Sequence, residues 1–573
     1  MSDRTMRKPS FAELYTPKLV TLLREGYRLR DLQADAIAGL TVAVVALPLS
    51  MAIAIACGLS PERGLYTAIV GGFLVSALGG SRFQIGGPAG AFIVVIFSIV
   101  ERQGYDGLVI ATMMAGAMML VVGFMRWGTY IKYIPYPVTV GFTAGIATII
   151  FASQIKELLG LDLASEPAAL IPKLTALAGA IGTIRPMTMA MSILAVAIIL
   201  ILRRLRPNWP GILIAVALCA ALTGLLHLDV ATIGSRFGGV PRMLPSPALP
   251  AFDLTRMWTL LPDAFSIALL GSIESLLSAV VADGMTGRRH RSNCELVAQG
   301  VANIVAPIFG GMPVTGTIAR TATNVRAGAK GPVSGMLHAL YVLLFMLIAA
   351  PLAAYIPLAS LGAVLAVVAW SMAEKEEFVA LVRAFGGDAL VLLATFLLTI
   401  FESLTLGIGV GVTLGAFLFL HRMAESIDVR EGQAFMGEDE ADSSEAATFA
   451  AQPSPNSDLM VYKISGAFFF GATAAVNAAL DRIGRYPSTF VFDFADVSLI
   501  DTTAAKALAA FVRKLRRANT RVSIAQARPG VRRTLLTAGL REPDVSYVGT
   551  IIEARERAEA GPAVTKLSLG AAR

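Results

Sequence analysis

The chain has 573 residues, of which 55% are hydrophobic and 15% are charged, and its mean hydropathy is +0.68. This composition excludes an ordinary water-soluble globular protein and predicts a polytopic membrane protein, because about 20 apolar residues span a bilayer as a helix. The formal net charge of +8 does not indicate nucleic-acid binding, since the basic residues are scattered over loops between apolar runs and act there as orientation signals.

The first thirty residues contain seven basic residues and no apolar run. We therefore expect no cleavable signal peptide and a segment, residues 1–30, that stays in the cytoplasm.

Fourteen apolar runs follow, seven on each side of a polar, proline-rich interval at 227–262. With a cytoplasmic N-terminus, the loops after even-numbered runs carry most of the basic residues. This asymmetry favours an even number of spans and a cell-membrane protein with both termini in the cytoplasm. The runs lie at about 36–57, 66–80, 88–100, 107–124, 138–155, 187–202 and 211–226, and then at about 264–283, 293–308, 316–327, 333–350, 357–372, 388–402 and 404–421.

Two segments interrupt these runs with paired glycines and a proline, GGSRFQIGGPAGAFI at 79–93 and GGMPVTGTIARTATNVRAGAK at 310–330. Non-helical backbone and charge at membrane depth are tolerated only where protein buries them or they line a cavity. Both segments involve the third run of their half, which favours two inverted repeats that meet at one binding site. We thus predict a transmembrane transport domain over residues 31–423.

The composition changes after residue 423. Residues 424–457 are acidic and poor in aromatic residues, which predicts a flexible linker. Residues 458–558 alternate between strands and helices, which is typical of a small α/β domain, and 559–573 form a tail. Strands are expected at 459–465, 489–495 and 521–527, helices near 471–484, 502–518 and 530–538, and a strand–helix pair at the end.

These residues resemble the sulfate permease (SulP) family of anion transporters, also called solute carrier family 26, from Asp31 to about Glu556. The resemblance rests on the stretches at 35–52, 64–73, 79–92, 271–311 and 320–329. It implies seven-plus-seven inverted repeats divided into a core and a gate domain, a homodimer, and an elevator-like movement of the core. The C-terminal part looks like the family's STAS domain (sulfate transporter and anti-sigma factor antagonist).

The two broken segments would place the N-termini of two half-helices opposite one another. A helix N-terminus presents free N–H groups and about half a positive charge, so it binds an anion. The alternative is that the glycines only allow close helix packing. The predicted substrate-binding residues are Ala89, Gly90, Ala91, Thr315, Gly316, Thr317, Ile318 and Arg320.

Arg320 and Glu274 are charged residues within apolar runs, where a charge indicates function. Arg320 would attract the anion or balance Glu274, and the resemblance favours the former. The family position that matches Glu274 holds an acid that serves the coupling ion in cation-coupled members. A buried carboxylate can exchange a proton, whereas a sodium ion would require several oxygen ligands, so we favour a proton over sodium. A fixed ion pair between the two would instead leave transport uncoupled.

The first span supplies the pocket wall at Ala46, Leu49 and Ile53. The chloride-handling animal members have glutamines in this span and a phenylalanine after the proline of span 3, where this chain has Ala89. A roomier, less polar pocket argues against chloride as the main substrate and leaves sulfate, bicarbonate and C4-dicarboxylates.

In the C-terminal domain, DVSLIDTTAAKAL at 496–508 resembles the phosphorylatable stretch of anti-sigma factor antagonists, and Thr503 falls on the modified position. Ala504 replaces the usual glycine, so we favour a helix cap by Asp501 or Thr502 over regulation. This domain also offers a surface for a cytoplasmic protein partner.

A secondary active transporter of a small anion is the predicted function, and an uncoupled channel or exchanger is the main alternative. A nucleobase-type carrier fits Arg320 poorly, and a membrane sensor does not explain the broken segments. Four separated histidines and three isolated cysteines match no catalytic or metal motif, so we expect neither an enzyme nor a cofactor nor a metal site.

Overall fold

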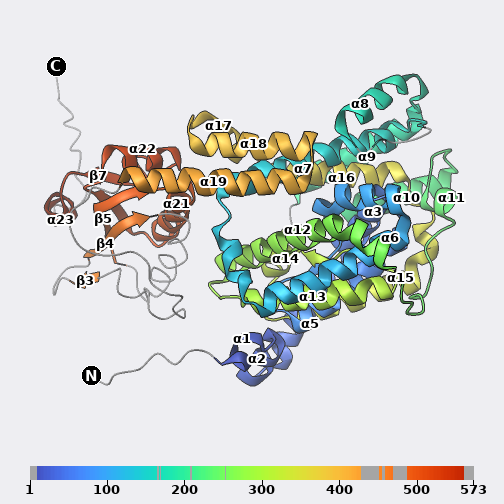
Figure 1. Ribbon diagram of the computed structural model, residues 1–573, viewed down its shortest axis with the longest axis horizontal. Coiled ribbons are helices and arrows are strands. Elements are labelled where there is room, and N and C mark those ends of the chain that lie inside the picture. Colours follow the sequence, from blue (N-terminus) through green and yellow to red (C-terminus); the bar gives the residue numbers. More distant parts are fainter. Residues whose placement is uncertain are drawn as a thin grey trace, which may run out of the picture. The chain divides into compact units, whose positions relative to one another are not determined.

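The computed structural model describes residues 10–163, 167, 169–206, 209–251, 253–426, 451–453, 459–468 and 487–559. The chain divides into two compact units (Figure 1). A helical unit comprises Ser10–Val382 and Asp388–Val412, and a second unit contains Arg383–Gly387 and Thr413–Arg573.

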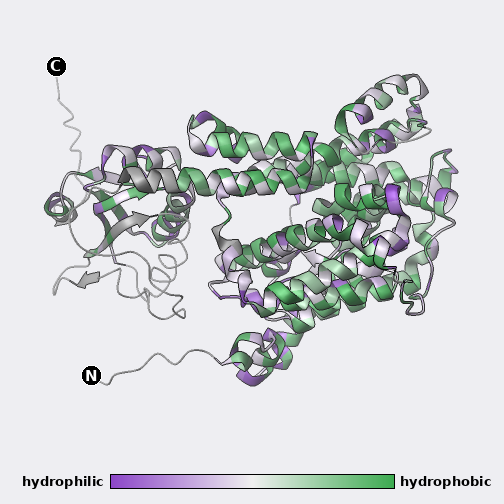
Figure 2. Ribbon diagram, viewed as in Figure 1, coloured by the Kyte–Doolittle hydropathy of each residue, from purple (hydrophilic) through white to green (hydrophobic). Residues whose placement is uncertain are grey.

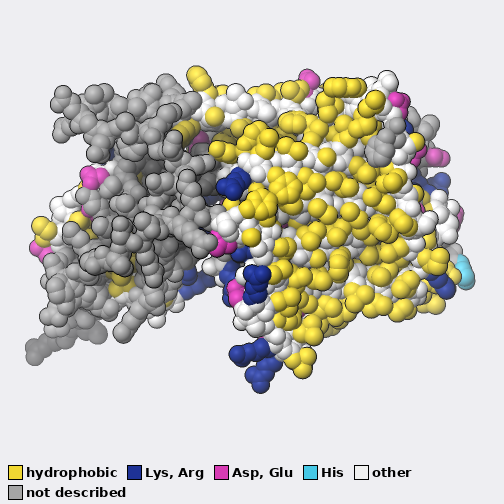
Figure 3. Space-filling model, turned by 60° about the horizontal axis from the view of Figure 1, so that its bottom comes forward, with side chains coloured by type: hydrophobic (Ala, Val, Ile, Leu, Met, Phe, Trp, Pro, Cys, Tyr) yellow, Lys and Arg dark blue, Asp and Glu magenta, His cyan; other side chains and the backbone are white. Residues whose placement is uncertain are grey.

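Seven described helices of this helical membrane-type protein are long and apolar enough to cross a bilayer. Hydrophobic residues dominate them (Figure 2), and hydrophobic side chains cover most of the face of the helical unit in Figure 3. They are α3 (Leu29–Ala56), the stretch Gly90–Phe124 with α6 (Ile93–Phe124), α7 (Tyr136–Leu159), α9 (Pro186–Leu205), α12 (Leu254–Thr286), α15 (Val333–Ala353) and the stretch Leu358–Arg383 with α16 (Leu358–Met372) and α17 (Lys375–Arg383).

Shorter helices complete this part of the chain. Those with apolar sequences are α8 (Leu170–Gly179), α10 (Gly211–Leu226) and α18 (Gly387–Phe401), and α19 (Leu404–Ser426) has a short apolar stretch at Leu404–Phe419. Further short elements are α1 (Phe11–Tyr15), α2 (Lys18–Glu25), α11 (Ile233–Phe237) and the 3-10 turns η3 (Trp127–Tyr133) and η4 (Ile181–Thr183).

The predicted runs at 88–100 and 107–124 both fall in α6, which consists of two helices that meet at a kink. Gly104 interrupts it with φ 67° and ψ −176°, a backbone conformation that glycine adopts without steric cost. The run at 66–80 is also composite, because α4 (Pro61–Tyr66), a π-helical turn η1 (Thr67–Gly71) and α5 (Gly72–Leu78) follow one another directly.

Small residues let the long helices pack closely. A Cβ atom added to Gly116 of α6 would lie 2.7 Å from the carbonyl oxygen of Gly300, and the reverse substitution would meet Gly116 at the same distance. Gly300 belongs to α13 (Ser292–Ile308), so α6 and α13 touch through their backbones. Such contacts replace the hydrophobic driving force that is missing between helices in lipid.

The second unit contains a five-stranded sheet in the order β3-β4-β5-β6-β7. Strand β3 is antiparallel to β4 and the other pairs are parallel, with Tyr462 opposite Phe492, Phe492 opposite Ile524, and Ile524 opposite Tyr547. The strands are β3 (Ala451–Pro453), β4 (Leu459–Phe468), β5 (Thr489–Ile500), β6 (Arg521–Ala525) and β7 (Ser546–Val548).

Helices cover both faces of this sheet. Leu508 of α21 (Thr502–Arg517) and Val531 of α22 (Pro529–Thr537) pack with Phe490 and Phe492, whereas α23 (Ile551–Glu559) packs on the opposite face. The predicted helix near 471–484 and most of the predicted acidic linker lie outside the described residues. Strand β3 lies inside the range predicted as linker. Its backbone pairs with β4, so these three residues belong to the sheet.

Candidate functional site

The two interrupted segments pair with each other. Strand β1 (Gly86–Gly87) and strand β2 (Thr315–Gly316) form an antiparallel ladder with Gly86 opposite Gly316 and Gly87 opposite Thr315. The N–H group of Thr317 extends the contact by donating to the carbonyl oxygen of Ile85 at 3.1 Å. Stretches more than 220 residues apart in the sequence are thereby joined through their backbones.

A helical element starts directly after each strand. The 3-10 turn η2 (Gly90–Phe92) leads into α6, and α14 (Ile318–Arg326) follows Thr317; neither start carries a side-chain cap. Ala89, Ala91, Thr315 and Thr317 are buried, whereas Ile318 is 37% exposed. Backbone N–H groups at both starts are therefore not satisfied by a capping side chain.

Arg320, in the first turn of α14, crosses to the other segment. It is 3% exposed, and its Nη2 donates to Ser50 Oγ of α3 at 3.1 Å. Its Nε and Nη1 have no hydrogen-bond partner among the described residues. A Cβ atom added to Gly87 would lie 1.7 Å from Nη1, so the guanidinium group lies directly against the glycine backbone.

Glu274 of α12 lies close enough to Arg320 for an electrostatic interaction. In the described part of the chain the two side chains do not form an ion pair with each other. Its Oε2 is buried and has no hydrogen-bond partner in the described part of the chain. A buried carboxylate oxygen without a partner is costly. The side chain is therefore available to a proton or another cation.

Hydroxyl groups tie α12 to both segments. Ser275 Oγ accepts from Gln84 Nε2 at 2.7 Å, and Ser278 Oγ donates to Thr321 Oγ1 at 3.0 Å. Thr315 Oγ1 donates to the carbonyl oxygen of Gly271 at 2.9 Å. The ladder and Glu274 are thus held on one polar framework.

The predicted wall residues of α3 lie in the buried interior, with Ala46 at 0%, Leu49 at 9% and Ile53 at 2% exposure. Leu49 and Ile53 belong to the same hydrophobic core as Ala89 and Ala91. The contact from α3 to Arg320 comes instead from Ser50, which sequence reasoning did not select. The sequence signal that could have identified Ser50 is its hydroxyl group, the single one in the apolar stretch around Pro48.

Two more residues near the ladder were not anticipated. Gln84 packs beneath Gly316, since a Cβ atom there would lie 1.6 Å from Gln84 Nε2. His338 of α15 is fully buried, and neither ring nitrogen has a hydrogen-bond partner among the described residues. A histidine in an apolar helix was a signal in the sequence that His338 could be functional. Its proximity to Arg320 could not be predicted, because it depends on tertiary packing.

In the second unit, Thr503 is partly buried in the first turn of α21. The N-cap of this helix is Asp501, whose Oδ1 accepts from the N–H group of Ala504 at 2.7 Å. This is one of the two caps predicted from the sequence, and a regulatory role of Thr503 stays a prediction. The described residues contain no group of three or more His, Cys, Asp or Glu side chains placed to hold a metal ion.

Residues 32–395 match the family model of the sulfate permease family, and residues 451–547 match that of the STAS domain. A putative sulfate transporter, YvdB of Bacillus subtilis (strain 168), is 39% identical over 87% of this chain and 92% of its own length. The bicarbonate transporter BicA of a Synechocystis strain is 30% identical over 84% of this chain and 85% of its own length.

Solved structures show the same fold. The transmembrane domain of a cyanobacterial bicarbonate transporter BicA has a TM-score of 0.59 and 31% identity, and the match covers 67% of this chain and 98% of that chain. The overall structure of SLC26A9 has a TM-score of 0.65 over 95% of this chain and 93% of that chain, at 17% identity.

Proposed function

Since this chain belongs to the sulfate permease family and carries a STAS domain, we propose that it is a secondary active transporter of a small inorganic anion, sulfate or bicarbonate. The names of its relatives support this substrate class, because they include a putative sulfate transporter and bicarbonate transporters. The anion is held between the helix starts after β1 and β2.

The observation that carries the proposal is the antiparallel pairing of Gly86–Gly87 with Thr315–Gly316. It brings two uncapped helix starts together, and each contributes N–H groups and a partial positive charge. Arg320 adds a full charge and two nitrogens without partners among the described residues. A bound anion would satisfy these donors.

Glu274 supplies the proposed coupling. Its ionised carboxylate offsets the field of Arg320 and repels an anion, whereas its protonated form leaves that field free to attract one. A proton and the anion therefore bind together more favourably than either binds alone. This differential binding makes the two move as symport, and a sodium ion in place of the proton would act in the same sense.

We extend the proposal to the whole assembly. Fourteen spans form two inverted halves, both termini are cytoplasmic, and a core domain with the ladder moves like an elevator against a gate domain within a homodimer. The antiparallel direction of β1 and β2 supports the inversion, since inverted halves bring corresponding segments together in opposite directions.

The test is uptake of labelled sulfate, bicarbonate and succinate into proteoliposomes, with and without an inward proton gradient. Gradient-driven accumulation of sulfate or bicarbonate is expected. Accumulation of succinate alone would identify a C4-dicarboxylate carrier instead. Downhill flux that is indifferent to protons and sodium would contradict coupling and identify a channel or exchanger.

A further inference from the structure

Four basic residues from separate parts of the helical unit gather around α2. Lys18 is the first residue of α2, Arg82 lies between α5 and β1, and Arg288 and Arg291 lie between α12 and α13. We call Lys18, Arg82, Arg288 and Arg291 the basic cluster.

Backbone contacts bring the basic cluster together. The N–H group of Lys18 donates to the carbonyl oxygen of Gly79 at 3.0 Å, and that of Arg291 donates to the carbonyl oxygen of Gly80 at 3.0 Å. A Cβ atom on Gly80 would lie 2.1 Å from the carbonyl oxygen of Arg291, so this approach requires glycine. Arg291 Nη1 also donates to the carbonyl oxygen of Thr16 at 2.5 Å.

The carboxylates nearby do not balance these charges. Glu25 is ion-paired with Arg82 and lies 3.9 Å from Arg288. Asp283 is engaged elsewhere, because its Oδ2 accepts from the N–H group of His290 at 3.0 Å and lies 2.7 Å from His290 Nδ1. Glu295 is a third carboxylate close by, since its Oε2 accepts from the N–H group of Ser81 at 3.0 Å. The four cations of the basic cluster outnumber these three carboxylates, which leaves an excess of positive charge.

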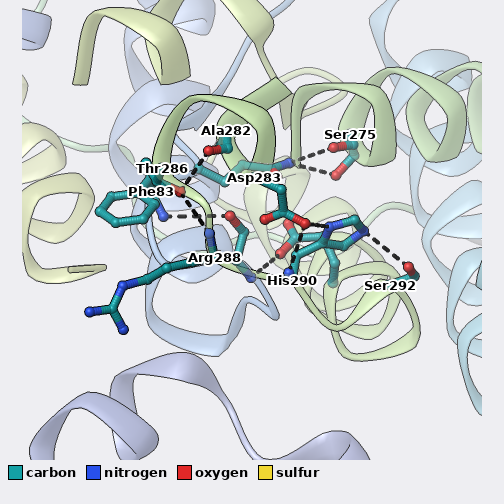
Figure 4. Close-up of polar contacts among 11 residues, drawn as sticks. Phe83, Ser275, Ala282, Asp283, Thr286, Arg288, His290 and Ser292 are labelled. Carbon is teal, nitrogen blue, oxygen red and sulfur yellow. Dashed lines mark hydrogen bonds and ion pairs between the residues drawn. The ribbon is translucent and has the colours of Figure 1, made fainter. Parts of the chain in front are cut away.

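The close-up in Figure 4 shows how Asp283 is occupied. The ring of His290 lies between Asp283 and Ser292, whose Oγ is 3.0 Å from Nε2, while the side chain of Arg288 extends away from this group. Asp283 is therefore held by a local network and does not form an ion pair with a member of the basic cluster in the described residues.

Lys18 experiences the excess charge directly. Burial, then Arg291 and Arg82, lower its pKa to about 8, although Asp283 and Glu25 act in the opposite direction. Its ammonium group has neither an ion pair nor a hydrogen bond among the described residues. Because Lys18 is only partly buried and Arg288 is exposed, a solute can reach the cluster.

We propose that the basic cluster binds a tetrahedral oxyanion, such as inorganic phosphate, sulfate or the phosphate monoester of a phosphatidic acid headgroup, at a second site. A negatively charged ligand offsets the excess positive charge, and charge-assisted hydrogen bonds from ammonium and guanidinium groups suit the oxygens of such an anion. The bound anion would fasten α2 to the loops that lead into β1 and α13. The inference does not depend on the proposed transport cycle.

The test measures binding of labelled inorganic phosphate to the full-length protein in nanodiscs of neutral lipid. An Arg320→Ala background removes the candidate transport site. Adding Lys18→Ala should weaken the remaining binding roughly tenfold or more, since a lost charge-assisted hydrogen bond costs about 1.5–3 kcal/mol. The matched control is Arg24→Ala, which removes one exposed charge from the same helix.

Lys18→Arg should retain binding, which separates charge from the packing of α2. Binding to the protein with Lys18 should weaken as the pH rises above about 8, because the ammonium group loses its proton there. Nanodiscs that contain phosphatidic acid distinguish the source: a lipid headgroup would compete with free phosphate. Equal binding with and without Lys18→Ala, or equal loss with Arg24→Ala, would overturn the proposal, as would no binding in either lipid.

Discussion

Arg320 keeps its position because Gly87 has no side chain. Its Nη1 occupies the space in which a Cβ atom of residue 87 would lie, at 1.7 Å. The glycine and the arginine therefore act as a pair across the ladder, although they come from opposite halves of the chain.

Gly87→Ala should displace the guanidinium group and lower anion uptake roughly tenfold or more, by the free energy of one charge-assisted contact. Uptake into proteoliposomes measures this change, and size-exclusion chromatography checks folding. Gly284→Ala in α12 is the matched control, because its added Cβ atom meets nothing within 4 Å. Normal uptake by Gly87→Ala would show that the position of Arg320 does not matter.

Arg320→Ala should abolish accumulation of the anion while the protein stays folded, since the remaining helix starts carry only partial charges. Arg326→Ala removes an exposed charge from the same helix and should leave uptake near the wild-type rate. If both variants transport alike, Arg320 has no part in binding.

Glu274→Gln mimics the protonated carboxylate, so the anion should still bind while the proton gradient no longer drives its accumulation. Exchange of labelled for unlabelled anion across the liposome membrane, compared with gradient-driven uptake, measures the two effects separately. Gradient-driven accumulation that survives the substitution would assign the coupling to another group.

At the scale of elements, the sequence was most informative where composition changes abruptly. The paired glycines and the proline identified both interrupted segments. Some of the apolar runs correspond to helices long enough to span a bilayer, and others to shorter helices such as α10 and α14. Periodicity could not reveal α8, which has ten residues and is too short to span a bilayer. The pairing of Gly86 with Gly316 and the contacts of Ser50 and Gln84 depend on tertiary packing, which one sequence does not encode locally.

The α6–α13 contact should be the most sensitive packing site in the helical unit. Gly116→Ala places a Cβ atom 2.7 Å from the carbonyl oxygen of Gly300, and overpacking of this kind costs about 1–3 kcal/mol. Thermal unfolding of the purified protein measures the loss.

For the whole molecule, two separate hydrophobic cores predict two unfolding transitions. Asp501→Ala removes the cap of α21 and should cost about 1 kcal/mol, which lowers the melting temperature of a domain of this size by about 4–8 °C. Calorimetry should show this shift in one transition, while Gly116→Ala shifts the other. A single transition that both variants move would mean that the units unfold together.

The ladder between β1 and β2 consists of backbone, and three of its four residues are glycines. Under the proposed function, the helix starts that follow this ladder offer main-chain N–H groups to the anion, and Arg320 adds a full positive charge. The predicted wall residues Ala46, Leu49 and Ile53 instead contribute side chains, which can be exchanged one at a time. Substitutions at Ala46, Leu49 or Ile53 should therefore change which anion is preferred, while the backbone pairing of the two segments is kept.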